Sequence, residues 1–188
     1  MRIALHDYRS LLDQETYGRL EAHWRLVQHW SPRLNLTAIR DPERAAWRHY
    51  RDSLEPLRVL NTGPWADIGS GAGFPGVPLA IVRPDVELTL VEPRRKRVSF
   101  LKTVVAELAL DNTTVVEGRS SDAPPQAFAG VVTRATFSQG DELKALANWC
   151  APGGWVIALR SEPSGAGGSR LYSYDLRDER RCMEVWGA

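Results

Sequence analysis

The chain has 188 residues, of which 43% are hydrophobic and 25% are charged. This composition is typical of one folded domain of ordinary size and excludes a disordered or fibrous chain. With 24 Lys and Arg against 23 Asp and Glu, the net charge is only +1. Any contact with nucleic acid must therefore come from a local basic patch.

The only two cysteines, Cys150 and Cys182, are not part of a Cys-x-x-Cys pair. Their number excludes a disulfide framework and a cysteine-based zinc site, and the histidines show no metal-ligand spacing. The longest apolar runs are far shorter than the ~20 residues of a membrane-spanning helix. We therefore expect a cytoplasmic protein with no membrane partner and no metal. We also expect a monomer.

Residues 1–60 are predicted to form a helical extension. Large apolar residues recur there at steps of three and four, which places them on one helix face. These residues are Tyr17, Leu20, Trp24 and Val27. Asp41 is suited to cap a second helix, and Pro42 fits the first turn of that helix.

From residue 61 onward, short apolar runs alternate with helical segments. The runs predicted to be strands are 65–68, 86–91, 113–116, 130–133 and 155–159. This alternation predicts an α/β fold with a doubly wound, mostly parallel sheet. The runs 171–174 and 182–186 are predicted to pair as antiparallel strands around a charged turn, 175–181. We expect one domain, 1–188, with this Rossmann-like core at 61–188.

The most informative segment is the glycine-rich stretch WADIGSGAGFPG, residues 65–76. It runs from a predicted strand through Gly69, Gly71 and Gly73 into a predicted helix. Glycines in such a loop permit tight turns and close approach of a ligand, and the start of the helix adds N–H donors. Glu92 closes the next strand, where its carboxylate is suited to accept hydrogen bonds from both ribose hydroxyls of a nucleoside.

Two ligand classes fit this loop. Gly71, Gly73 and Gly76 spell G-x-G-x-x-G, and Glu92 follows Gly71 by 21 residues, as in dinucleotide-binding proteins. Asp67, however, precedes the loop in the pattern D-x-G-x-G-x-G, which resembles the first motif of S-adenosylmethionine-dependent methyltransferases. A strand–turn–helix without a ligand is a third interpretation, because glycine motifs also occur without function.

Further motifs flank the glycine loop. In chain order they are 35–41 (NLTAIRD), 48–54 (RHYRDSL), 67–78 (DIGSGAGFPGVP), 81–84 (IVRP), Lys96–Arg97, Phe100–Leu101, Arg119 and 133–135 (TRA). Together they resemble the glucose-inhibited division protein B family, the 16S ribosomal RNA guanine-N7 methyltransferases. The resemblance spans roughly residues 30–160, and several linked motifs are far more specific than one loop.

The resemblance implies a class I methyltransferase fold with S-adenosylmethionine as the cofactor. Together with the glycine loop and the second strand, it implies these cofactor-binding residues: Asp67, Gly69, Ser70, Gly71, Gly73, Phe74, Glu92, Ser120, Ser121 and Arg134. The chain departs from the family pattern at two places. Ser121 replaces a usual acidic residue, and LRS at 159–161 replaces Leu-Lys-Gly before a short glycine-rich segment, 161–169.

The implied reaction needs little acid–base chemistry. Guanine N7 has a lone pair and no proton, so it can attack a sulfonium methyl group without a general base, and in-line positioning becomes the main task. The resemblance implies that Arg134 lies at the cofactor and the target base. We expect Arg134 to act in catalysis by holding guanine through O6, which leaves N7 free.

Basic residues suggest where RNA would bind. The densest basic run, 94–97, starts a predicted helix, where cations oppose the helix dipole at a cost of roughly a few tenths of a kcal/mol. RNA contact and a solvated helix start both remain open. The predicted RNA-binding residues are Arg40, Arg48, Arg94, Arg95, Lys96 and Arg97. His49 and Asp52, three residues apart on a helix, are expected to form a buried structural hydrogen bond.

The leading prediction is methyl transfer from S-adenosylmethionine to N7 of a guanine in 16S ribosomal RNA. The expected partner is that RNA or the small ribosomal subunit. One alternative is a methyltransferase of the same fold that acts on a small molecule or a protein. A second is an inactive nucleotide- or RNA-binding module, and a third is a nicotinamide-dependent dehydrogenase.

Overall fold

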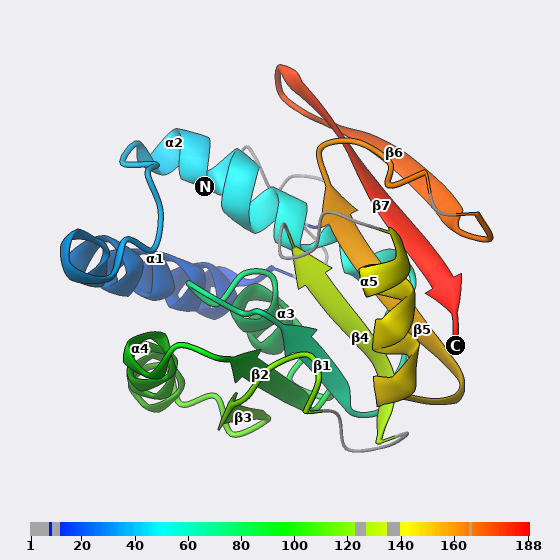
Figure 1. Cartoon of the computed structure of the whole chain (residues 1–188). Coiled ribbons are helices and arrows are strands. Elements are labelled where there is room, and N and C mark those ends of the chain that lie inside the picture. The colour runs from blue at the N-terminus through cyan, green and yellow to red at the C-terminus, as the bar shows by residue number, and fades with distance from the viewer. Residues whose placement is uncertain (1–7, 9–11, 123–126, 135–139, 166) are drawn as a thin grey trace.

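A computed structural model describes residues 8, 12–122, 127–134, 140–165 and 167–188 of the chain (Figure 1). Residues 1–7 and 9–11 of the predicted helical extension lie outside these ranges. The motif at 133–135 is described as far as residue 134.

The described strands form one seven-stranded sheet in the order β3-β2-β1-β4-β5-β7-β6. Their bounds are β1 Trp65–Ile68, β2 Leu88–Glu92, β3 Thr113–Glu117, β4 Phe128–Arg134, β5 Cys150–Arg160, β6 Arg170–Leu176 and β7 Glu179–Gly187. β1 to β5 pair in parallel, whereas β7 is antiparallel to both β5 and β6. The predicted doubly wound, mostly parallel sheet is confirmed.

The hairpin of β6 and β7 is longer than predicted, because its turn comprises only residues 177 and 178. Four charged residues that were assigned to the turn belong to the two strands: Asp175, Glu179, Arg180 and Arg181. In β6, buried Tyr174 and Leu176 alternate with exposed Asp175, so the charge faces solvent. A charge on the outer face of an edge strand is compatible with the strand and protects its edge.

The helical extension begins with α1 (Gln14–Leu34), whose predicted apolar face is buried. The predicted second helix is present but divided. It consists of α2 (Pro42–Ala45), the π-helix η2 (Ala46–Arg51) and the 3-10 helix η3 (Glu55–Arg58). Asp41 caps α2, as predicted. The wider π-helical turn changes which side chains lie above one another.

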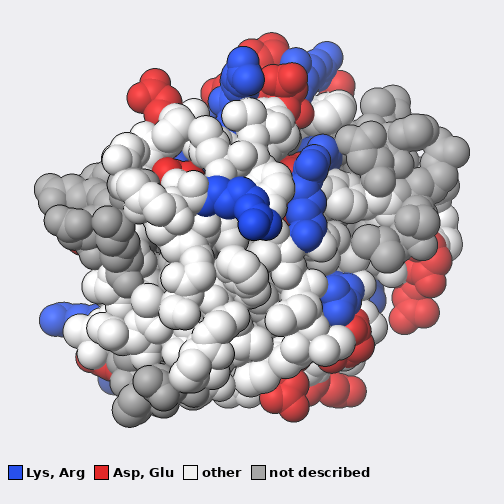
Figure 2. Space-filling model, turned by 90° about the vertical axis from the view of Figure 1, so that its right-hand side faces the viewer, with Lys and Arg blue, Asp and Glu red and all other residues white. Residues whose placement is uncertain are grey.

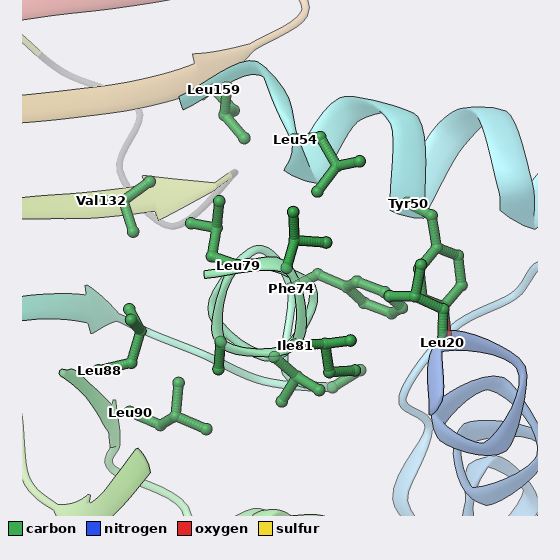
Figure 3. Close-up of a cluster of buried hydrophobic side chains, with 14 of the residues drawn as sticks. Leu20, Tyr50, Leu54, Phe74, Leu79, Ile81, Leu88, Leu90, Val132 and Leu159 are labelled. Carbon is green, nitrogen blue, oxygen red and sulfur yellow. The ribbon is translucent and has the colours of Figure 1, made fainter. Parts of the chain in front are cut away.

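α3 (Gly76–Val82) lies at the centre of the core, and all seven of its residues are buried. Figure 3 shows α3 along its axis, with Val132 and Leu159 of the sheet on one side and Leu20 and Tyr50 on the other. A short helix that is apolar all round requires cover on every side. The helical extension therefore forms an outer layer that completes the burial of α3.

The remaining helices cover both faces of the sheet (Figure 1). α4 (Arg95–Glu107) lies on the face of α3, whereas α5 (Gly140–Ala145) and the 3-10 helix η4 (Leu146–Trp149) belong to the opposite face. In β1, Trp65 packs into the first core and Ala66 into the second. This alternation explains why the central strands appear as continuous apolar runs in the sequence.

Alanine substitutions at two glycines would test the packing of the core. A Cβ at Gly130 in β4 would overlap the ring of Trp65 and lie 2.8 Å from the carbonyl oxygen of Trp155, whereas a Cβ at Gly18 in α1 would meet nothing within 4 Å. We expect Gly130→Ala to lower the free energy of unfolding by about 1–3 kcal/mol. The matched control, Gly18→Ala, should raise it by roughly 0.5–1 kcal/mol. Urea unfolding measures both, and equal effects at the two sites would contradict this account of β4.

Candidate functional site

The glycine-rich loop, residues 69–75, leaves the carboxyl end of β1, which lies between β2 and β4. The connections that follow β1 and β4 run to opposite faces of the sheet, and ligands of open α/β sheets bind at such a point. Gly69 and Gly71 have φ angles of +79° and +58°, a conformation that other L-residues rarely adopt. The predicted loop and the helix that follows it are both confirmed.

Glu92, the last residue of β2, holds this loop. Its Oε2 accepts the N–H of Gly71 at 2.9 Å, and its Oε1 accepts the N–H of Arg94 at 3.0 Å. The residue is only 2% exposed. Because a carboxylate accepts up to about four hydrogen bonds, Glu92 retains capacity for the hydroxyl groups of a ligand.

The loop and Glu92 open onto a cleft of about 450 Å³. This volume is within the range of about 300–1,000 Å³ that is common for small-molecule sites. Its lining comes from six segments, and the residues are Leu36, His49, Gly69, Ser70, Gly71, Ala72, Phe74, Glu92, Pro93, Arg94, Arg97 and Arg134. Six of the ten predicted cofactor-binding residues are among them.

The helical extension holds the glycine-rich loop from its buried side. His23 of α1 is fully buried, and its Nε2 lies 3.0 Å from the carbonyl oxygen of Ala72. Since a carbonyl oxygen only accepts, Nε2 carries the proton, and Nδ1 accepts the hydroxyl of Tyr50 at 3.0 Å. Burial lowers the pKa of His23 to about 4, so the ring is neutral near pH 7.

Phe74 contacts two polar groups of the cleft. The ring of His49 stacks on it with centroids 4.6 Å apart, and the guanidinium of Arg134 lies 4.9 Å from its centroid. Arg134 also donates to the carbonyl oxygen of Arg48 at 3.3 Å and to Asp52 at 3.4 Å. Burial lowers the pKa of Arg134, and the charge of Asp52 opposes this shift.

The predicted hydrogen bond between His49 and Asp52 is wrong. Nε2 of His49 pairs with the hydroxyl of Thr37 at 2.9 Å, and Nδ1 is buried without a hydrogen-bond partner. Asp52 pairs instead with Arg134 and with the C-terminal hairpin. The π-helical turn explains the error, because residues three apart no longer share a face there. Burial, followed by the charge of Arg134, lowers the pKa of His49 to about 3.

Asp67 and Gly73 do not line the cleft. Asp67 is fully buried, and its Oδ2 accepts the N–H of Gly76 at 3.0 Å, at the start of α3. A Cβ at Gly73 would lie 2.7 Å from the side chain of Val77 and 3.2 Å from His23. In this structure both residues shape the loop from within the core.

Ser120 and Ser121 also lie outside the lining of the cleft. The hydroxyl of Ser121 donates to Asp122 at 3.0 Å, and the carbonyl oxygen of Ser120 accepts the indole N–H of Trp149 at 2.7 Å. Asp122 and Trp149 line a second cavity, of about 300 Å³, beside β2 and β3. The serine pair thus belongs to the neighbouring strand end.

The predicted RNA-binding residues divide into two groups. Arg94 and Arg97 line the cleft, and Arg97 also donates to the carbonyl oxygen of Asn35 at 3.3 Å. Arg48 forms an ion pair with Glu179 at 2.6 Å, away from the cleft. Three more are exposed outside the lining: Arg40, Arg95 and Lys96.

Our sequence predictions missed four residues of the lining: Leu36, His49, Ala72 and Pro93. Ala72 lies inside the glycine loop, and Pro93 follows Glu92 directly. Leu36 and His49 fall within the flanking motifs 35–41 and 48–54, which were the available signal. In the described ranges, no three His, Cys, Asp or Glu side chains gather closely enough to hold a metal ion.

The GidB family model, described as rRNA small subunit methyltransferase G, matches residues 16–166. This chain belongs to that family. The Ribosomal RNA small subunit methyltransferase G of Sodalis glossinidius is 46% identical over 127 residues, which are 67% of this chain and 60% of that relative. The protein of the same name from Escherichia fergusonii is 39% identical over 158 residues, 81% of this chain and 74% of the relative.

Solved structures agree on the fold of this family member. A methyltransferase from Geobacter sulfurreducens has a TM-score of 0.64 at 12% identity, covering 98% of this chain and 96% of that one. A SAM-dependent methyltransferase from Aquifex aeolicus has a TM-score of 0.56 at 17% identity, covering 77% and 93%. At these identities the similarity establishes the class I methyltransferase fold.

The buried carboxyl of Asp67 predicts a pH effect. Burial raises its pKa from 3.8 to about 7, although the N–H of Gly76 opposes the shift. A raised pKa in the folded state contributes stability that is complete below the unfolded value and is lost as pH rises through the folded value. We expect the stability of the wild type relative to Asp67→Asn to fall as pH rises from about 4 to about 7. Urea unfolding across this range measures the difference, and parallel curves would contradict the raised pKa.

Proposed function

We propose that this protein transfers a methyl group from S-adenosylmethionine to N7 of a guanine in 16S ribosomal RNA. The observation that carries the proposal is the cleft of a GidB-family chain in which Glu92 holds Gly71 and Arg134 enters from β4. The similar proteins from Sodalis glossinidius and Escherichia fergusonii are named ribosomal RNA small subunit methyltransferases.

The residues of the cleft fit the proposed cofactor. The carboxylate of Glu92, which retains acceptor capacity beside Gly71, would accept the ribose hydroxyls, and the backbone of Gly69 and Gly71 would permit close approach. Ser120 and Ser121, at the next strand end, would lie toward the adenine. S-adenosylmethionine supplies a methyl group on a sulfonium centre, which is an electrophile.

The side chains around Phe74 suit the proposed base. Arg134 offers donors to guanine O6 and leaves the N7 lone pair uncovered, so the reaction needs orientation rather than a general base. A guanine methylated at N7 carries a positive charge. His49 is neutral near pH 7 because burial lowers its pKa, so its ring adds no positive charge beside the product, while Arg134 shares the carboxylate of Asp52 with Arg181.

We assign the RNA contact to the mouth of the cleft, where Arg94 and Arg97 lie at the start of α4. Figure 2 shows a different side of the molecule, the one with β6, β7 and the C-terminus. Most of the described side chains drawn there are uncharged, and several of the basic ones lie beside acidic ones. A chain of net charge +1 needs such a local basic site to attract phosphates.

The described part of the chain contains no helix with the length and apolarity of a membrane span. Because the proposed substrate belongs to the small ribosomal subunit, we propose that the protein acts in the cytoplasm.

Methylation of ribosomal RNA tests the proposal directly. We expect purified protein with methyl-labelled S-adenosylmethionine and unmodified small subunits, or free 16S RNA, to yield 7-methylguanosine, detected by mass spectrometry of the nucleosides. Arg134→Ala should lower the turnover by roughly a hundredfold, since misplaced reactants lose most of the orientation effect. The control is Arg180→Ala, which removes an exposed guanidinium of β7.

Other outcomes of this assay support the alternatives. Methylation of small molecules or proteins with no labelled RNA would replace the proposed substrate. Binding of S-adenosylmethionine or RNA without any methylated product would indicate a binding module. Near-normal turnover by Arg134→Ala would remove the role of Arg134 in the reaction.

RNA binding should depend on position within the basic run. We expect the pair Arg94→Gln and Arg97→Gln to weaken RNA binding and to reduce the slope of log K against log salt by about 1.5, the value for two lost phosphate contacts. The pair Arg95→Gln and Lys96→Gln removes the same charge from the same helix turn outside the cleft and should change the slope far less. Fluorescence anisotropy with labelled RNA measures both, and equal losses would show that position does not matter.

A further inference from the structure

The C-terminal hairpin contacts the site through one buried carboxylate. Tyr174 of β6 and Arg181 of β7 face each other in the hairpin register, and both side chains reach Asp52, which follows η2. Asp52 is fully buried, and Tyr174 is only 6% exposed. Asp52 lies more than 120 residues before both Tyr174 and Arg181 in the sequence, so the fold brings the three together.

The two oxygens of Asp52 have different partners. Oδ1 accepts the hydroxyl of Tyr174 at 2.7 Å and Nε of Arg181 at 3.3 Å. Oδ2 accepts an N–H of Arg181 at 3.4 Å and one of Arg134 at 3.4 Å. The short hydrogen bond from Tyr174 to Oδ1 therefore holds the carboxylate in place, while Oδ2 accepts from Arg134.

Arg134 depends on this carboxylate for its place in the cleft. Its side chain is only 14% exposed, and a buried guanidinium requires a charged partner. One guanidinium nitrogen donates both to Asp52 and to the carbonyl oxygen of Arg48, and the group lies over the ring of Phe74. A shift of the carboxylate would move the charge of Arg134 relative to Phe74 and the cleft.

We propose that Tyr174 and Arg181 are positioning residues, which fix Asp52 and through it the guanidinium of Arg134. Neither residue lines the cleft that holds the proposed chemistry. The C-terminal hairpin thus contributes to the transfer site indirectly, through its hydrogen bonds to Asp52. This inference rests on the proposed function, in which Arg134 orients the target guanine.

The test removes one hydroxyl from each of two tyrosines in β6. Tyr174→Phe deletes the hydrogen bond to Asp52, whereas Tyr172→Phe deletes a hydroxyl whose hydrogen bond among the described residues is a long one from Arg170, at 3.5 Å. In single-turnover methylation of small subunits, we expect Tyr174→Phe to slow methyl transfer roughly tenfold because orientation is lost. The affinity for S-adenosylmethionine should stay close to that of the wild type. Tyr172→Phe should match the wild type in both.

A double-mutant cycle separates positioning from a general loss of structure. If Tyr174 acts through Arg134, then Tyr174→Phe should have no further effect in the Arg134→Lys background. If the two losses multiply, or if Tyr174→Phe transfers methyl at the wild-type rate, the inference is overturned. Single-turnover reactions with excess enzyme keep slow variants measurable.

A second readout does not need activity. The Nε–H signal of Arg134 in a nitrogen-15 spectrum is assigned by its loss in Arg134→Lys. It should shift in Tyr174→Phe and stay in place in Tyr172→Phe, and an unmoved signal in Tyr174→Phe would overturn the inference. If the wild type forms no 7-methylguanosine, the proposed function fails, and this spectrum still decides whether the hairpin positions Arg134.

Discussion

A carboxylate at the end of β2 holds the backbone N–H of Gly71, and the shape of the cleft depends on this contact. The loop has to turn sharply at a buried strand end, where few other donors and acceptors are available. Glu92 secures one side of the loop through its hydrogen bond from the N–H of Gly71. His23 secures the other side through its hydrogen bond to the carbonyl oxygen of Ala72. The loop is therefore fixed by two residues that lie far from it in the sequence.

The helical extension is consequently part of the site. Because α3 is apolar all round, it requires α1 and η2 as an outer layer. This layer brings His23 and His49 to the loop and Asp52 to Arg134. The same packing that buries Leu20 and Tyr50 thus places a neutral ring and a carboxylate beside Phe74 and Arg134. In this molecule, core burial and site geometry are satisfied by the same contacts.

The parts of the structure that were predictable from sequence are those with local signals. Strands buried on both faces appear as apolar runs, and the glycine loop and Glu92 follow the carboxyl ends of neighbouring strands, so these two were expected to lie together. Arg134 was added by the family resemblance, and all three residues line one cleft. The surroundings of Asp52 leave no such signal, because its partners lie 82 to 129 residues away. The error at His49 has a local cause, since a π-helical turn has no pattern that distinguishes it from an α-helix in one sequence.

The charge balance of the cleft follows from burial. Burying a guanidinium as deeply as that of Arg134 is costly without a carboxylate partner. A carboxylate that paired with Arg134 alone would, however, cancel the charge that this residue presents to a substrate. Asp52 avoids this outcome because it is shared between Arg134 and Arg181 and also accepts the hydroxyl of Tyr174. Because the carboxylate also serves Arg181 and Tyr174, Arg134 retains donor capacity for a carbonyl oxygen such as guanine O6. A chain that is almost neutral as a whole thereby keeps a guanidinium in the cleft, where a nucleobase would need a hydrogen-bond donor.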